Sequence, residues 1–231
     1  MYKDNKQSKD YRYERKIVVT SFNEQEIELF VKQHPALLSQ KFPLRFVNNI
    51  YLDSINFINY YDNIDGVMDR CKVRIRWYGD LFGRIEKPIL ELKLKKGLMG
   101  RKQLFSLQPF TLNKGFNVNN VIRVVEKSNL PPMLINNLAD LSPTLLNRYK
   151  RKYFETYDGK YRLTIDSEMN YYQIDHYNNM FLNCIKDYDH IVLEIKYSNK
   201  EDVDAHYFSN YFPFRITKNS KYINGIESLM D

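Results

Sequence analysis

The sequence has few of the residues that several common architectures and chemistries require. It contains two cysteines, four histidines and one tryptophan in 231 residues. Two cysteines are too few for a disulfide framework, so we expect a reducing compartment and a cytoplasmic protein. Only eight glycines and eight prolines occur, which excludes a collagen-like or linker protein. No window approaches 18 uncharged apolar residues, so the sequence predicts neither a membrane-spanning helix nor a signal peptide.

Aromatic and basic residues, by contrast, are plentiful. There are 19 tyrosines and 14 phenylalanines, a content that excludes a disordered chain. Thirty-five basic residues against 28 acidic ones give a net charge of +7. Such a balance suits a polyanionic partner, whether nucleic acid, a membrane face or a small molecule. No linker or repeat divides the chain, and we expect a tail over residues 1–10 followed by a single domain over 11–231.

Eight segments alternate between apolar and polar residues with period two, which predicts strands with two different faces. They are Tyr11–Val19, Phe46–Leu52, Cys71–Tyr78, Ile89–Lys95, Gln103–Leu107, Arg148–Glu155, Tyr161–Glu168 and Ile191–Tyr197. Helices are predicted at 24–33, with a capping box formed by Ser21 and Glu24, and at Asn119–Ser128, Met133–Leu141, Val203–Tyr211 and Lys218–Leu229. Without a βαβ rhythm, these strands favour an α+β fold, a closed eight-stranded antiparallel β-barrel with helices packed outside.

The polar faces of these strands are strongly charged. Three strands carry the pattern E-x-K, at Glu14–Lys16, Glu91–Lys93 and Glu194–Lys196, and a fourth carries Arg74 and Arg76. A charged strand face is usually the solvated side of a sheet. Repetition of the same acid-then-base spacing favours another geometry, in which the polar faces line a lumen and the apolar faces lie under the helices. Eight strands enclose space for one small ligand.

The predicted lumen is more basic than acidic. Its candidate bases are Arg12, Lys16, Arg74, Arg76, Lys93, Arg151, Arg162, Lys196, Lys218 and Lys221. Its candidate acids are Glu14, Glu91, Asp166, Glu168 and Glu194, which leaves an excess of five positive charges. We expect an anion to fill such a pore, because like charges repel one another there. A triphosphate with a divalent cation fits, since carboxylates hold cations and arginines fork onto phosphate oxygens.

Seven motif blocks in order give a family resemblance that covers about Tyr11 to Gly225. They are RYERK at 12–16, KVRIRWYG at 72–79, LELK at 90–93, RYKRKYF at 148–154, YRLTIDSE at 161–168, LEIK at 193–196 and ITKNSKYINGI at 216–226. The chain resembles the polyphosphate-polymerase (VTC) domain of the vacuolar transporter chaperone family, which belongs to the triphosphate tunnel metalloenzyme (CYTH-like) superfamily.

The resemblance implies a tunnel in which the γ-phosphate of ATP is transferred to a growing polyphosphate, with Mn²⁺ or Mg²⁺ as cofactor. It implies phosphate-binding roles for Lys16, Lys218 and Lys221, and phosphate-binding and catalytic roles for Arg74, Arg76, Lys93, Arg151 and Arg162. As a candidate base of the lumen, Lys196 is expected to bind phosphate too. Glu194 matches the family's metal-holding glutamate, and Glu14 and Glu91 are weaker metal candidates. Because the attacking phosphate oxygen is already ionised, the reaction needs no catalytic histidine or cysteine, and we place the four histidines at the surface.

The first strand departs from the pattern of the superfamily's hydrolases. Those enzymes begin with E-x-E-x-K, whereas this chain has Arg12, Glu14 and Lys16 at the matching positions. The loss of one carboxylate favours the polymerase, although an inorganic or nucleoside triphosphatase and a non-catalytic polyphosphate- or nucleotide-binding module remain alternatives. We expect no nucleic-acid partner, because the aromatic and basic residues of Arg148–Phe154 alternate within one strand. Any contact with the inner face of a membrane would need a separate membrane-protein partner.

Overall fold

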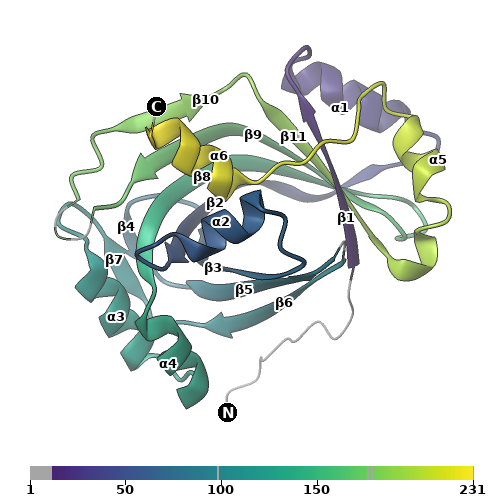
Figure 1. Ribbon diagram of the computed structural model, residues 1–231. Coiled ribbons are helices and arrows are strands. Elements are labelled where there is room, and N and C mark those ends of the chain that lie inside the picture. Colours follow the sequence, from purple (N-terminus) through teal and green to yellow (C-terminus); the bar gives the residue numbers. More distant parts are fainter. Residues whose placement is uncertain (1–11, 98, 176, 178, 231) are drawn as a thin grey trace.

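Eight antiparallel strands form a closed ring in the computed structural model, which describes residues 12–97, 99–175, 177 and 179–230 (Figure 1). Around the ring the strands follow the order β9-β11-β1-β6-β5-β3-β2-β8, and β8 pairs again with β9. Their bounds are β1 (Arg12–Val19), β2 (Ser39–Asp53), β3 (Asp69–Tyr78), β5 (Ile89–Lys96), β6 (Met99–Ser106), β8 (Ser142–Glu155), β9 (Arg162–Gln173) and β11 (Ile191–Ser198). All eight predicted strands are therefore present, and the predicted closure is confirmed.

The remaining elements surround this ring. Strand β10 (Cys184–Asp187) extends the sheet beside β9, and β4 (Gly83–Ile85) pairs with β7 (Phe110–Leu112). The helices are α1 (Glu24–Gln33), α2 (Ile58–Ile64), α3 (Val118–Lys127), α4 (Pro132–Ala139), α5 (Ala205–Asn210) and α6 (Lys221–Met230), with a 3₁₀ turn at Asn199–Glu201. The sequence patterns did not predict α2 or the three short strands. None of the described helices has the length and apolar character that crossing a bilayer requires.

Apolar side chains on the outer faces of the strands form two cores beneath the helices. On one side of the ring, Ile75 and Trp77 of β3 lie in a buried cluster with residues of α3 and α4. On the other, Ile17 of β1 and Ile195 of β11 cluster with residues of α1 and α5. Burial of this apolar surface stabilises the ring from outside. The alternating charged residues of the same strands consequently face inward.

Helix α1 begins with a capping box, but at a different residue from the predicted Ser21. The Asn23 side chain accepts hydrogen bonds from the backbone N–H groups of Gln25 and Glu26, and Glu26 accepts one from the Asn23 N–H at 2.7 Å. Glu24 lies instead against the outside of the sheet, where it accepts a hydrogen bond from Ser167. The sequence pattern therefore located the helix correctly and assigned its cap two residues early.

Helix α6 covers one opening of the ring and packs on luminal side chains (Figure 1). A methyl group added at Gly225 would lie 2.6 Å from side-chain atoms of Leu145 and Tyr171, so only glycine permits this close approach. Tyr222 stacks on Tyr51 and donates a hydrogen bond to the buried Asp53 at 2.6 Å. The ring is thus filled by apolar and aromatic contacts at the end that α6 occupies.

The ring is not equally well paired all round. Strand β1 pairs with β11 along its whole length, from Arg12 opposite Ser198 to Val19 opposite Ile191. Among the residues that the structure describes, its other edge pairs with β6 at two positions, Arg12 with Gly100 and Tyr13 with Met99. The junction of β1 and β6 is therefore the least hydrogen-bonded seam among the ring strands described.

One histidine contradicts the expectation of a surface position. His34 is only 4% exposed, and its Nε2 lies 3.0 Å from the backbone oxygen of Phe208. Its ring packs on those of Phe208, Tyr211 and Phe212, so it joins α1 to α5 as part of the core. His190 and His206 are exposed as predicted, and His176 lies outside the described residues.

Candidate functional site

Two of the E-x-K strands are neighbours in the ring, and their antiparallel register explains the pattern. Glu14 of β1 lies opposite Lys196 of β11, and Lys16 lies opposite Glu194. Reversing the direction of an acid-then-base sequence sets each acid against a base, and opposite charges directly across a sheet stabilise the pair. All four side chains lie on the luminal face and line one pocket.

On the third E-x-K strand, the glutamate binds two arginines of the neighbouring strand. Glu91 of β5 lies opposite Arg74 of β3, and its carboxylate receives Arg74 at 2.5 Å and Arg76 at 3.0 Å. Lys102 of β6 approaches the same carboxylate at 3.0 Å. Burial alone would raise the pKa of Glu91, but these three cations outweigh burial and hold its pKa well below the usual range. Glu91 is 2% exposed and stays ionised.

A second buried network joins β8, β9, β11 and α6. Arg151 forks onto Asp166 at 2.5 and 2.6 Å, and its Nη2 also lies 3.3 Å from Glu194. Lys221, the first residue of α6, places its ammonium 2.6 Å from Asp166. Burial opposes the charge of Lys221, but the two carboxylates beside it raise its pKa above the usual value. Both cations are therefore fixed in the lumen by carboxylates.

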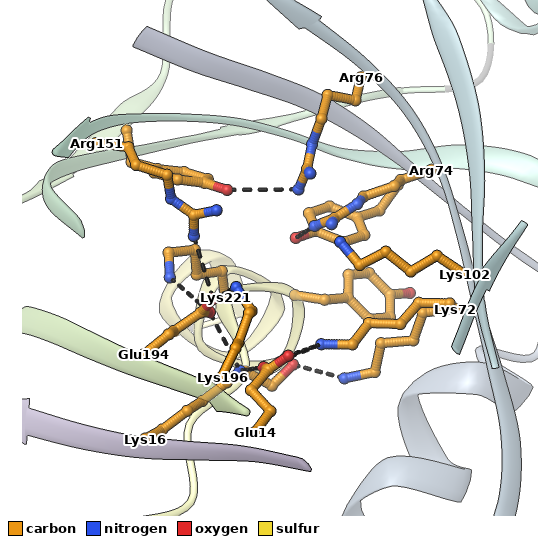
Figure 2. A pocket seen from close by; sticks show the side chains of 15 residues that line it. Glu14, Lys16, Lys72, Arg74, Arg76, Lys102, Arg151, Glu194, Lys196 and Lys221 are labelled. Atoms are coloured by element: carbon orange, nitrogen blue, oxygen red, sulfur yellow. Dashed lines mark hydrogen bonds and ion pairs between the residues drawn. The ribbon is translucent and has the colours of Figure 1, made fainter. Parts of the chain in front are cut away.

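These networks surround a single pocket in the ring, into which charged side chains point from several walls (Figure 2). Nine bases line it: Lys16, Lys72, Arg74, Arg76, Lys93, Lys102, Arg151, Lys196 and Lys221. Four carboxylates pair with them, which leaves an excess of five positive charges when all groups are ionised. The pocket has a volume of about 50 Å³, room for only a few waters at roughly 10–15 Å³ each. A larger anion would have to displace lysine side chains from their carboxylate partners.

The structure brings most of the predicted site residues together. Asp166 lies behind Arg151 and Lys221, and the residues that line the pocket as predicted are Glu14, Lys16, Arg74, Arg76, Lys93, Arg151, Glu194, Lys196 and Lys221. Glu91 lies directly against the pocket through Arg74 and Arg76.

Four predicted luminal residues lie elsewhere. Arg162, 56% exposed in its side chain, pairs with Glu155 at the end of β9. Lys218 is exposed and lies outside α6, which begins at Lys221 and not at Lys218 as predicted. Arg12 is exposed at the start of β1. Glu168 has a positive φ of 52° beside a register shift, and it pairs with Lys150 on the outer face.

The pocket also contains residues that the sequence analysis did not assign to it. They include Lys72 and Lys102, together with Tyr51, Tyr149, Ser220 and Tyr222. Lys72 is in phase with Arg74 and Arg76, a signal that its position at a strand end obscured. Lys102 lies opposite Lys93 on β6, a relation that only the strand register reveals. The Tyr149 hydroxyl accepts a long hydrogen bond from Arg76 at 3.5 Å.

Ion pairs within the lumen therefore compensate more of its positive charge than the sequence suggested. The excess of bases predicted mutual repulsion that only an anion could relieve. In the structure Glu14 contacts Lys93 and Lys16, and Glu91 contacts three cations. Ion pairing inside the ring offsets the repulsion, although a positive excess remains available to an anionic ligand.

Two carboxylates could share a divalent cation. Glu14 and Glu194 approach the same Lys16 ammonium at 3.4 and 3.6 Å, so both face one position. The described residues contain no group of three histidine, cysteine or carboxylate side chains of the kind that holds a metal alone. Mg²⁺ commonly binds through one or two carboxylates, with substrate phosphates and water completing its shell. The pair fits such a shared site, whereas Glu91 does not, since both of its oxygens are taken by arginines.

Lys72 gives the pocket a measurable response to pH. Burial and the nearby charges of Lys16 and Lys93 lower its pKa to about 6, and its contact is with the Ser220 hydroxyl at 2.7 Å. Lys72 is therefore neutral above pH 7. An anion that enters the pocket should raise the pKa of Lys72, so that the amine takes up a proton. We expect the wild type to take up more protons at pH 8 than Lys72→Met when inorganic tripolyphosphate binds.

Calorimetry in buffers of different ionisation enthalpy measures this uptake directly. Because binding consumes a proton at Lys72, the contribution of this lysine to affinity should decline as pH rises from about 7 to 9. Lys160→Met, at a side chain 53% exposed and remote from the pocket lining, is the matched control. Equal proton uptake by the wild type and Lys72→Met would show that Lys72 does not meet the ligand.

Comparison with known families identifies the chain. A family model described as the VTC domain matches residues 11–230. The chain belongs to the VTC domain family. The resemblance inferred from the seven motif blocks is thus confirmed. Comparison with curated protein sequences finds no match.

Solved structures share the fold of this VTC domain at low sequence identity. The PH1819 protein from Pyrococcus horikoshii is 14% identical, with 94% of this chain and 99% of that chain covered and a TM-score of 0.51. A "putative adenylate cyclase" from Vibrio parahaemolyticus is 11% identical, with 90% and 94% of the two chains covered and a TM-score of 0.51. At such identities the likeness concerns the fold alone.

Proposed function

We propose that this VTC domain is an ATP-dependent polyphosphate polymerase that transfers the γ-phosphate of ATP to a growing polyphosphate chain. Family membership supports this class of reaction, and the basic excess of the pocket supports a phosphate chain as its occupant. Arg74 and Arg76 lie side by side on one wall, where two guanidinium groups can fork onto successive phosphates. Phosphoryl transfer depends mainly on alignment and charge neutralisation, which this arrangement can supply.

The pKa values of the luminal carboxylates support phosphoryl transfer over hydrolysis. Glu14, Glu91 and Glu194 are each held by cations that outweigh the effect of burial, and their pKa values lie well below the usual range. A general base works best with a pKa near the operating pH, so these groups are poor activators of water. A terminal phosphate oxygen is already ionised and needs no such base. This favours a phosphate acceptor over water.

Glu14 and Glu194 would hold the divalent cation, which would supply neutralisation of phosphate charge during transfer. Lys16, which both carboxylates approach, would bind the phosphate chain together with Lys93 and Lys196, which pair with the same carboxylates in the free pocket. The residues that bind one another in the free pocket would thereby become the ligands of the substrate.

One incubation tests the proposal. The purified protein is mixed with ATP and Mn²⁺ or Mg²⁺, and the products are followed by ³¹P NMR. We expect ADP and internal phosphate signals of a polymer. Release of inorganic phosphate alone would identify a triphosphatase, and tight binding without turnover would identify a binding module. Glu168→Gln, on the outer face, should retain full activity and controls for general effects of charge removal.

A further inference from the structure

The luminal face changes in character beyond Arg76 and Arg151. On β2 and β8, Phe42 lies opposite Tyr153 and Arg45 lies opposite Arg151. Val47 lies opposite both Tyr78 and Tyr149, which places Tyr78 on the same face. Antiparallel partners share a face of the sheet, and Arg151 and Tyr149 line the pocket. Phe42, Arg45, Tyr78 and Tyr153 therefore form one luminal group, hereafter the aromatic mouth.

The aromatic mouth is built around an arginine that no carboxylate neutralises. The Arg45 guanidinium lies 5.0 Å from the ring centre of Phe42, 5.6 Å from that of Tyr78 and 5.7 Å from that of Tyr153. Within the described part of the chain it makes no ion pair with an acid. Phe42 and Tyr78 are 44% and 47% exposed, so flat surfaces remain accessible to a ligand.

This chemistry does not suit a phosphate chain alone. The face of an aromatic ring carries negative charge density, which phosphate oxygens avoid. A second cation would be repelled by Arg45, which already occupies the space between the rings. A flat, uncharged π-system can stack on both the rings and the guanidinium plane. Among molecules that carry a chain of phosphates, a nucleobase has this property.

Among the luminal residues that the structure describes, the opposite end has no comparable exposed ring. Tyr51 stacks on Tyr222 of α6, and the two residues are 4% and 2% exposed. Beyond Arg74, the luminal positions of β3 are Lys72 and Arg70, and Arg70 lies opposite Lys95 of β5. The two ends of the ring therefore differ, with exposed rings at one and cations beside buried rings at the other.

We propose that the aromatic mouth binds the base of a nucleoside triphosphate, whose phosphates extend past Arg151 and Arg76 into the pocket. The inference rests on the proposed function, because it assumes that the pocket holds a phosphate chain. It assigns an orientation to the substrate, in which the γ-phosphate lies deepest, toward Lys93, Lys16 and α6. It also explains why exposed aromatic residues interrupt the charged lining at one end only.

The test compares two ligands that differ only in the nucleoside. Calorimetric titrations with Mg²⁺ measure the affinities of ATP and inorganic tripolyphosphate for the wild type and for Phe42→Leu with Tyr78→Leu. Stacking of a base on a protein ring is worth roughly 1–3 kcal/mol, and we expect ATP to bind about 10-fold more weakly to the variant. The affinity for tripolyphosphate should stay within about twofold. Tyr78→Phe keeps the ring and should retain ATP affinity.

Several results would overturn the assignment. Equal losses for both ligands would show that the rings only support the lumen, and unchanged ATP affinity would show that they do not touch the base. If the variant unfolds, contacts from the adenine protons to Phe42 and Tyr78 in NMR spectra of the wild type decide the matter, and their absence refutes the base site. Tripolyphosphate binding without any preference for ATP rejects the base site alone, whereas failure to bind either ligand rejects the proposed function too.

Discussion

Glu91→Gln should lower the free energy of unfolding of the ligand-free protein by about 3–5 kcal/mol. Glu91 is 2% exposed and is the common partner of Arg74, Arg76 and Lys102. Removal of one member of a buried ionic network leaves the others desolvated without compensation. Chemical denaturation measures the loss, and Glu168→Gln, at a side chain 45% exposed, should change stability by much less.

The same variant should respond more strongly to an anion. Once Glu91 is neutral, the three cations that it held can turn to a phosphate chain. We therefore expect tripolyphosphate to stabilise Glu91→Gln by a larger increment than it stabilises the wild type, so that the ligand restores part of the lost stability. A loss that tripolyphosphate does not reduce would mean that these cations do not face the ligand.

The network also has a defined pH dependence. The pKa of Glu91 in the folded protein is well below that of an unfolded glutamate, because its three cations outweigh burial. A carboxylate with a lowered pKa contributes stability that is present above its unfolded pKa and is lost as pH falls toward the folded value. The wild type should therefore lose its stability advantage over Glu91→Gln as the solution is acidified below about pH 4.

Replacing Arg74 and Arg76 together by methionine should abolish most phosphate binding. Each charge-assisted hydrogen bond contributes roughly 1.5–3 kcal/mol, so two lost contacts should weaken tripolyphosphate binding by about 100-fold or more. Titration calorimetry with the inorganic ligand measures this without dependence on turnover. Arg74→Lys with Arg76→Lys retains the charge without the fork, and we expect intermediate affinity.

The stability of the variant with Arg74 and Arg76 replaced by methionine shows whether these arginines mainly repel other luminal bases or mainly stabilise Glu91. The sequence alone predicted repulsion among the luminal bases, which the loss of two arginines would relieve. Because the two arginines hold the buried Glu91, we now expect lower stability. Addition of Glu91→Met should recover stability, since replacing a whole buried ion network by apolar side chains is often neutral. Binding should stay lost, which distinguishes a lost contact from a damaged fold.

The period-two patterns predicted the ring because each strand has two contrasting faces. All eight predicted strands belong to it, since the helices cover the apolar outer faces while the charged faces turn inward. The short helix α2 and the three-residue strands β4 and β7 were missed because they are too short to show a periodic pattern of apolar and polar residues. His34 was misplaced because its burial depends on α5, which is distant in sequence.

The site was predicted less completely, for reasons of register. Glu168 is in phase with Asp166 in the sequence, yet its positive φ beside the irregular pairing of β8 and β9 turns it to the outer face. Lys102 belongs to the pocket because of its position opposite Lys93, which no single strand reveals. The count of five excess positive charges with all groups ionised is nevertheless the same in the structure, because the misplaced residues and the missed lysines compensate in charge.

The way the ring closes has a consequence for how the protein folds. Arg15 of β1 donates a hydrogen bond to the Tyr197 hydroxyl of β11 at 2.6 Å across a separation of 182 residues, while the described residues of β1 and β6 pair at two positions. Contacts so distant along the chain raise the contact order and are formed late and slowly. We therefore expect β1 to dock last and the charged luminal side chains to stay hydrated until it does. Their dehydration on docking should make the folding kinetics unusually sensitive to salt.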